Sequence, residues 1–166
     1  MLDEAHKIKA RTSSTAKSAI NLSARRRWCL TGTPLQNRVG ELYALVRFLQ
    51  LDPFAFYGCS CKGCDCRALH WRFGPKQRKC ETCDHPKTKH FSFFNNKILN
   101  PIKRYGYVGD GRTAMLLLKE QVLDKVMLRR TKTERAADVK LPPLKIEIAR
   151  LALDDAERDF YEGIYK

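Results

Sequence analysis

Cysteine spacing is the first feature of this sequence that could carry chemistry. Six of the seven cysteines lie between Cys59 and Cys83. Within this stretch, Cys61-x2-Cys64 and Cys80-x2-Cys83 stand fifteen residues apart, which is the spacing of a zinc ribbon. In a zinc ribbon, two such pairs supply four thiolates that surround one Zn²⁺ ion. We therefore predict a zinc site formed by these two pairs.

Further cysteine and histidine side chains in the same stretch could bind a second ion. The candidate second set is Cys66, His85 and His90, which Cys59 or His70 would complete. The residues leave open whether one ion or two are bound, because a surface histidine often binds no metal ion. Disulfides are the other use of clustered thiols, and a reducing compartment disfavours them.

Two adjacent carboxylates near the start are the second group that could carry chemistry. Asp3 and Glu4 follow the apolar Met1-Leu2, so we expect them in the loop after a buried strand. In nucleotide hydrolysis, one such carboxylate holds the Mg²⁺ that bridges the phosphates, and the next orients or deprotonates the attacking water. Without further context, the pair is equally consistent with an exposed acidic terminus.

Alternating strand and helix patterns surround these carboxylates. Residues 27–31 have the pattern of a short buried strand, and apolar residues recur at helical spacing in 14–24 and 39–49. The order strand, loop, helix, strand, loop, helix is typical of a parallel α/β sheet. We expect Trp28 and Leu42 in its core.

The sheet pattern breaks at the cysteine-rich segment. Residues 58–93 have little periodic apolar pattern and many basic side chains, so we predict that they form an insertion. Helical periodicity returns at 95–103 and strongly at 113–128. The apolar face of the second helix comprises Leu117, Leu118, Val122, Leu123, Val126 and Met127.

The last part of the chain shows a linker, a strand pattern and a helix start. Residues 141–143 form the proline-containing linker, and apolar residues alternate as in a strand over 144–153. Asp154 and Glu157 have the spacing of a capping box that opens a final helix.

Several of these segments resemble one known family. Asp-Glu-Ala-His-Lys-Ile-Lys (3–9) is similar to the Walker B segment, or motif II, of the Swi/Snf-type ATPases of helicase superfamily two. Leu-Thr-Gly-Thr-Pro-Leu-Gln-Asn (30–37) resembles motif III, and 41–49 resembles the helix after it. Residues 127–132 and 141–145 resemble the brace and the start of the second motor lobe.

The insertion narrows the resemblance to a subfamily. Four segments in or next to it look like those of the fungal nucleotide-excision-repair DNA translocases that also carry a RING finger. They are Cys-x2-Cys-Asp-Cys, Cys-x2-Cys-x-His, residues 69–71 and residues 94–96. In that subfamily the RING finger belongs to later sequence. The stretch from Cys59 to Cys83 is too short for the eight-ligand cross-brace of a RING finger.

The resemblance implies roles for the matching residues. Asp3 would hold Mg²⁺, Glu4 would act on the attacking water, and His6 would couple the nucleotide site to the neighbouring motifs. For two further arginines of this sequence, Arg129 and Arg130, exposure at a solvated helix end is an equally open interpretation. The residues that would couple ATP to DNA are Thr31, Gly32, Thr33, Gln36, Arg129 and Arg130.

One expected motif is missing from the 166 residues. A phosphate-binding loop needs G-x-x-x-x-G-K-[ST], and no glycine in this sequence is followed by lysine. Most of the second lobe, with its arginine fingers, is also absent. We therefore expect an internal piece of a motor that does not hydrolyse ATP alone, and a truncated gene model is a further explanation.

Charge favours a polyanionic partner. The net charge is +14, of which residues 1–27 carry +5 and residues 59–104 carry +8. Clustered cations bind DNA phosphates by releasing counterions, although the insertion would also suit a protein partner. The longest apolar runs are far too short for a membrane span, so we expect no membrane partner.

The combined prediction is a partial RecA-like α/β lobe with a zinc-binding insertion, a helical brace and the start of a second lobe. Its function would be ATP-dependent translocation on double-stranded DNA or chromatin, in nuclear repair complexes, with ATP, Mg²⁺ and Zn²⁺ as cofactors. The alternative is a non-catalytic, zinc-dependent nucleic-acid-binding or scaffold protein derived from such a motor. The four predicted segments are 1–57, 58–93, 94–140 and 141–166.

Overall fold

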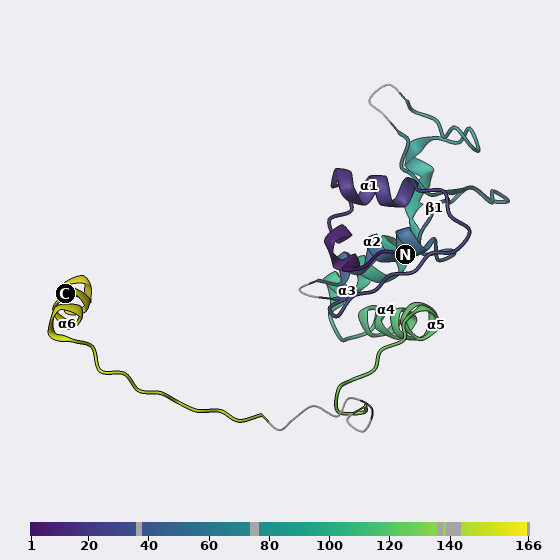
Figure 1. The fold of residues 1–166 in the computed structure, drawn as a ribbon. Coiled ribbons are helices and arrows are strands. Elements are labelled where there is room, and N and C mark those ends of the chain that lie inside the picture. The colour runs from purple at the N-terminus through teal and green to yellow at the C-terminus, as the bar shows by residue number, and fades with distance from the viewer. Residues whose placement is uncertain (36–37, 74–76, 136–137, 139–143, 166) are drawn as a thin grey trace. The chain divides into compact units, whose positions relative to one another are not determined.

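The computed structural model describes residues 1–35, 38–73, 77–135, 138 and 144–165. These residues form two compact units, Met1–Leu128 and Arg129–Lys166 (Figure 1). The predicted linker at 141–143 and the motif III residue Gln36 lie outside the described residues. Among the described helices, none has the length and hydrophobicity that a membrane span requires.

Among the described residues, short helices dominate the first unit, and its three strands lie within the insertion or at its start. Up to the insertion the elements are η1 (Ala5–Ile8), α1 (Ser14–Asn21) and α2 (Val39–Leu49). The insertion contains β1 (Tyr57–Cys59), β2 (Arg67–Ala68), η2 (Lys87–Lys89) and β3 (His90–Ser92). The helices that follow it are η3 (Asn95–Leu99), α3 (Asn100–Tyr105), α4 (Asp110–Leu118), η4 (Lys119–Leu123) and α5 (Asp124–Val126).

Helices α1 and α2 occur where the sequence predicted them. The Ser13 hydroxyl caps α1 by accepting a hydrogen bond from the Ala16 amide at 3.2 Å. Helix α1 ends at Asn21, three residues before the predicted end, and it buries the predicted face of Ala16, Ala19 and Ile20. Helix α2 has the predicted bounds and is buried along most of its length.

The predicted parallel pairing is present as a single bridge. Leu2 pairs with Cys29 in parallel, with Leu2 N donating to Trp28 O and Leu30 N donating to Leu2 O, both at 2.8 Å. The described residues supply only these two short segments, so no larger parallel sheet forms among them. The RecA-like sheet therefore stays a prediction. The prediction that Trp28 lies in the core was wrong: its side chain is 65% exposed because no described element covers it.

The core of the first unit combines α2 with η1, α1 and the helices after the insertion. Tyr43 and Phe94 stack with ring centroids 5.0 Å apart, and both are fully buried. Ile98 on η3 and Val122 on η4 are also fully buried. The segment predicted as a helix over 95–103 begins as a π-helical turn and continues as α3 to Tyr105.

The second predicted helix of this region is divided in the structure. Helix α4 starts at Asp110 and is followed by the π-helical turn η4 and the short α5. Leu118 and Val122 of the predicted apolar face are buried. Val126 and Met127 are 40% and 38% exposed. The π-helical turn η4 shifts the angular position of the residues that follow it, so these two side chains point away from the core.

The insertion folds around a small antiparallel sheet that sequence patterns did not predict. Its strand order is β2-β1-β3, and β1 pairs with β3 so that Cys59 lies opposite His90. In Figure 1 the insertion, drawn in teal, projects from the helices of the first unit beside α1. The sheet places the start and the end of the insertion next to each other.

The described residues of the second unit form one regular element, α6 (Asp155–Tyr165). The predicted capping box is confirmed: Glu157 N donates to Asp154 Oδ1 at 2.7 Å, and Asp154 N donates to Glu157 Oε2 at 3.1 Å. The predicted strand over 144–153 is wrong, since these residues form no regular structure and are exposed. A strand needs a hydrogen-bonded neighbour, and the described residues of this unit offer none.

Candidate functional site

Backbone pairing brings the predicted motif II loop next to the predicted motif III strand. Besides the Leu2–Cys29 bridge, Ala5 N donates to Leu30 O at 2.9 Å. These bonds hold η1, which carries Ala5 and His6, directly beside Thr31. Two segments about 25 residues apart in the chain therefore form one local structure.

Side chains of the two segments also contact each other. His6 Nδ1 lies 3.2 Å from Thr31 Oγ1 and 3.1 Å from Glu4 Oε2. A carboxylate only accepts hydrogen bonds, so the contact with Glu4 requires a proton on Nδ1. Thr31 Oγ1 in addition accepts a hydrogen bond from Thr33 N at 3.2 Å. His6 thus links the predicted water-activating carboxylate to the motif III threonine.

The backbone at Glu4 is unusual for a residue with a side chain. Its φ of 48° and ψ of 47° lie in the left-handed region, which costs a non-glycine residue about 1 kcal/mol or more. The Asp3 carboxylate stabilises this turn by accepting a hydrogen bond from Glu4 N at 2.8 Å. Both carboxylates are exposed, and their oxygen atoms are ligands of the kind that Mg²⁺ prefers.

The remaining residues predicted to couple ATP to DNA fall in three places. Gly32 and Thr33 follow Thr31 directly, and a Cβ added at Gly32 would meet open space. Gln36 is outside the described residues. Arg129 and Arg130 lie in the second unit, where both are exposed. The roles of all these residues stay predictions.

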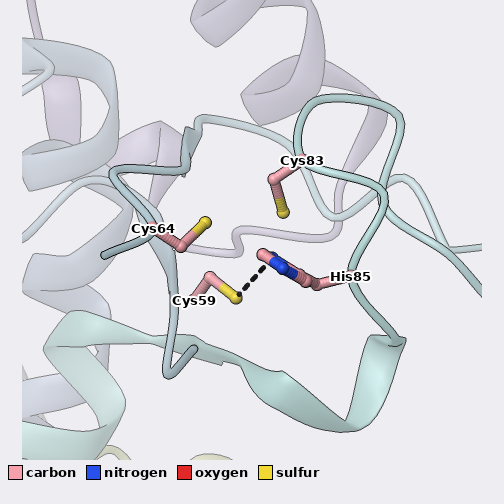
Figure 2. Close-up of side chains that lie close together, drawn as sticks. All are labelled: Cys59, Cys64, Cys83 and His85. Carbon is pink, nitrogen blue, oxygen red and sulfur yellow. Dashed lines mark hydrogen bonds between the residues drawn. The ribbon is translucent and has the colours of Figure 1, made fainter. Parts of the chain in front are cut away.

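A second candidate site lies in the insertion, where cysteine and histidine side chains gather in two clusters. In the first, which we call the outer cluster, the four side chains point toward one another (Figure 2). All of its ligand atoms lie within 4.8 Å of each other, and Cys59 Sγ is 3.6 Å from His85 Nδ1. The outer cluster comprises Cys59, Cys64, Cys83 and His85.

The second cluster, which we call the inner cluster, is more buried. Cys66 Sγ lies 3.7 Å from Cys80 Sγ, and Cys83 Sγ lies 3.3 Å from His90 Nε2. Cys66, Cys80 and His90 are each less than a tenth exposed. The inner cluster comprises Cys66, Cys80, Cys83 and His90, so Cys83 belongs to both clusters.

Local turns position the thiols of both pairs. Cys64 N donates to Cys61 O at 3.1 Å across a turn in which Gly63 has a φ of +75°. In the other pair, Thr82 N lies 3.4 Å from Cys80 Sγ and donates to it. Burial raises the pKa of the Cys80 thiol, but hydrogen bonds from the Thr82 and Cys83 amides and from neighbouring thiols outweigh burial and lower the pKa to about 6. A thiol with a lowered pKa is deprotonated readily, as metal binding requires. Burial and the thiols of Cys66, Cys80 and Cys64 instead raise the pKa of Cys83 well above its ordinary value.

The clusters divide the predicted ligands differently from the sequence analysis. The predicted first set was Cys61, Cys64, Cys80 and Cys83 around one ion, but the structure places Cys64 in the outer cluster and Cys80 in the inner cluster. Cys61 belongs to neither, although it interacts with the thiol of Cys59. Strand register explains the difference, because β1 and β3 place Cys59 beside the histidine-bearing segment. His70 lies outside both clusters.

A buried polar junction connects the insertion to α2. The Ser92 hydroxyl donates a hydrogen bond to Tyr43 Oη at 3.0 Å, and Ser92 Oγ accepts one from Asn95 N at 3.3 Å. The Arg47 guanidinium, on the same helix as Tyr43, donates to the Leu69 carbonyl of the insertion. Sequence reasoning missed this junction. The only signal was a polar residue, Ser92, between apolar neighbours at the end of the insertion.

Comparisons with known proteins agree with the resemblance to the Swi/Snf-type ATPases. Residues 1–58 match the SNF2-related domain. The chain is 46% identical over 165 residues to the ATP-dependent helicase rhp16 of Schizosaccharomyces pombe, covering 99% of this chain and 19% of that protein. It is 33% identical to DNA repair protein RAD5 of Gibberella zeae and 31% identical to DNA repair protein RAD5A of Arabidopsis thaliana. These two matches cover 99% and 100% of this chain, and 11% and 13% of the relatives.

The chain thus spans a fifth or less of the length of the curated relatives it matches. The similarity runs across the insertion and both units, and is not confined to the residues of the SNF2-related domain. The resemblance of this chain to the Swi/Snf-type, SNF2-related ATPases is therefore confirmed.

Proposed function

We propose that this chain is the part of an ATP-dependent, double-stranded-DNA translocase that couples ATP hydrolysis to movement on DNA. The motor would act in the nucleus, in nucleotide-excision repair and on chromatin, together with subunits of a repair complex. The phosphate-binding loop would come from sequence outside these 166 residues. The zinc-binding insertion would serve as a structural module on the first motor lobe.

The contact between His6 and Thr31 is the observation that best supports this proposal. A motor must transmit the state of the nucleotide site to the DNA-binding elements through packed or hydrogen-bonded groups. His6 contacts both Glu4 at 3.1 Å and Thr31 at 3.2 Å, so a change at the carboxylate reaches motif III through one side chain. Asp3 would hold Mg²⁺, and Glu4 would orient or deprotonate the attacking water.

Exposed cations of the insertion support the DNA-binding part of the proposal. Arg78 and Lys87 lie on adjoining segments, because Lys87 N donates to Arg78 O at 2.9 Å. Lys62 is exposed on the turn between Cys61 and Cys64. Such side chains are suited to phosphate contacts, which carry no sequence information and favour duplex DNA of any sequence.

ATP turnover tests the proposed activity. We expect the complete gene product to hydrolyse ATP with stimulation by duplex DNA, and the isolated 166-residue chain to show no turnover. Turnover by the isolated chain would contradict the assignment of the phosphate-binding loop to other sequence. A complete product that binds DNA without any DNA-stimulated turnover would instead favour the non-catalytic binding module.

The salt dependence of DNA binding tests the role of the insertion. Each phosphate contact contributes about 0.9 to the slope of log K against log salt concentration. Replacing three exposed cations of the insertion by glutamine should therefore reduce the slope by up to about 3. An unchanged slope and affinity would remove the insertion from the DNA interface. The test set is Lys62, Arg78 and Lys87, and the matched control set on the helices is Lys97, Lys103 and Arg112.

A further inference from the structure

We propose that the insertion holds two Zn²⁺ ions in one centre, and that the Cys83 thiolate bridges them. The outer ion would be bound by Cys59, Cys64 and His85, and the inner ion by Cys66, Cys80 and His90, with Cys83 as fourth ligand of each. This assignment deepens the zinc-binding role proposed above. It depends only on the geometry of the insertion and is independent of ATP hydrolysis.

Ligand separations agree with tetrahedral zinc. Zinc–sulfur bonds of about 2.3 Å and zinc–nitrogen bonds of about 2.0 Å predict S···S separations of about 3.8 Å and S···N separations of about 3.6 Å. The Cys66–Cys80 separation is 3.7 Å, and the Cys59–His85 separation is 3.6 Å. The Cys83–His90 separation is slightly shorter, at 3.3 Å. These three separations are close to those of a zinc site, and all ligand atoms within each cluster lie within 4.8 Å of one another.

The second ring nitrogen of His90 supports its assignment as a ligand. His90 Nδ1 lies 3.1 Å from the Pro86 carbonyl oxygen, which only accepts hydrogen bonds, so Nδ1 carries the proton. The lone pair is then on Nε2, the atom that faces Cys83 Sγ. Zinc-binding histidines are commonly oriented in this way by a backbone carbonyl. Burial of the ring removes the alternative of a solvated surface histidine.

A hairpin places Cys83 between the two clusters. Cys80 N donates to His85 O at 3.0 Å, and Asp84 N donates to Cys80 O at 2.9 Å, which closes a tight loop around Cys83. Asp84 completes this loop with a left-handed φ of 55°. The loop holds Cys83 Sγ within 4.8 Å of every other ligand atom in both clusters. One shared thiolate gives each ion four ligands with seven side chains.

Charge also favours the shared ligand. Five thiolates and two Zn²⁺ ions leave a net charge of −1 on the centre. Two separate sites completed by the Cys61 thiolate would instead contain six thiolates and carry −2. The smaller charge is the easier one to hold where Cys66 and His90 are buried.

NMR of the ¹¹³Cd-loaded 166-residue chain tests the bridge without any substitution. We expect two ¹¹³Cd resonances, and couplings from the β-protons of Cys83 to both of them. The β-protons of Cys64 should couple to one resonance only, and those of Cys80 to the other. A single resonance, or coupling of Cys83 to one ion alone, would overturn the proposal.

Zinc content measured by mass spectrometry provides the second test. The unmodified chain should hold two ions, and Cys66→Ser should reduce the content to one. Because Cys61 lies beside Cys59, the outer ion is removed by the double variant Cys59→Ser with Cys61→Ser, which should also hold one ion. Cys29→Ser, outside both clusters, should retain two. Retention of two ions by the double variant would contradict the assignment of the outer site. None of these measurements depends on ATPase activity, so their failure is distinguishable from failure of the motor proposal.

Discussion

The hydrogen bond between Ser92 and Tyr43 predicts a specific energetic coupling between the insertion and the helical core. Ser92 lies two residues after the proposed ligand His90, so alternation along β3 places both side chains on the same, buried face. The bond is 3.0 Å long, and Tyr43 is fully buried. Burial raises the pKa of Tyr43 to about 12, so its hydroxyl group stays protonated at neutral pH.

Removing both partners should cost less than the sum of the two single removals. Ser92→Ala leaves the buried Tyr43 hydroxyl without its donor, which should reduce the free energy of unfolding by about 1–3 kcal/mol. Tyr43→Phe should cost about 1 kcal/mol, since Ser92 Oγ still accepts the Asn95 amide. The double variant leaves no unpaired hydroxyl at Tyr43, so its cost should fall below the sum by roughly 1 kcal/mol.

Urea unfolding of the zinc-loaded chain measures this coupling, provided that the m-value is unchanged among the variants. The control cycle combines Ser92→Ala with Tyr105→Phe, whose side chain is exposed and should give additive effects. Additivity of Ser92→Ala and Tyr43→Phe would refute the reasoning. The bond would then contribute nothing to the attachment of the insertion.

Three further predictions follow from single residues. Gly111→Ala should destabilise the chain by about 1–3 kcal/mol, because an added Cβ would lie 2.2 Å from the Gly106 carbonyl oxygen. The control variant Gly40→Ala makes only ordinary van der Waals contacts, so it should be neutral or stabilising. Thermal unfolding compares the two variants. Burial raises the pKa of Cys29 to about 11. At pH 8, iodoacetamide should therefore alkylate Cys29 roughly a hundredfold more slowly than an unperturbed thiol. A rate equal to that of a free thiol would contradict its burial. The pKa of Tyr43 is higher in the folded chain than in the unfolded chain, so its contribution to the free energy of unfolding should be complete below pH 10 and lost between about pH 10 and 12. The Tyr43→Phe variant should lack this part of the pH dependence of unfolding.

Sequence patterns predicted the helices that pack through one continuous apolar face. Helix α2 and the buried face of α1 follow from 3.6-residue periodicity, and the capping box at Asp154 follows from two side chains three residues apart. These features depend on neighbours in sequence, so local reasoning was sufficient. The strand predicted over 144–153 fails for the opposite reason. Its alternation could be satisfied only by a partner strand that the described residues do not contain.

The composition of the two metal-ligand clusters could not be predicted from the spacing of cysteines and histidines in the sequence. The Cys-x2-Cys pairs indicated a metal-binding insertion, and both clusters lie inside it. Their composition is set by the pairing of β1 with β3 and by the hairpin around Cys83, which bring together residues up to about 30 positions apart. The sharing of Cys83 has no sequence signature at all. It arises because one turn places a single sulfur atom between two groups.

The motif II loop and its contact with motif III are central to the proposed function, and Glu4→Gln tests them most directly. In the complete gene product, we expect this variant to bind ATP normally and to lose DNA-stimulated hydrolysis by roughly a hundredfold or more, because a positioned general base contributes about 10²–10⁴ to the rate. Glu120→Gln, an exposed carboxylate on η4, serves as the matched control and should leave turnover unchanged. Unaltered hydrolysis in the Glu4→Gln variant would contradict the account.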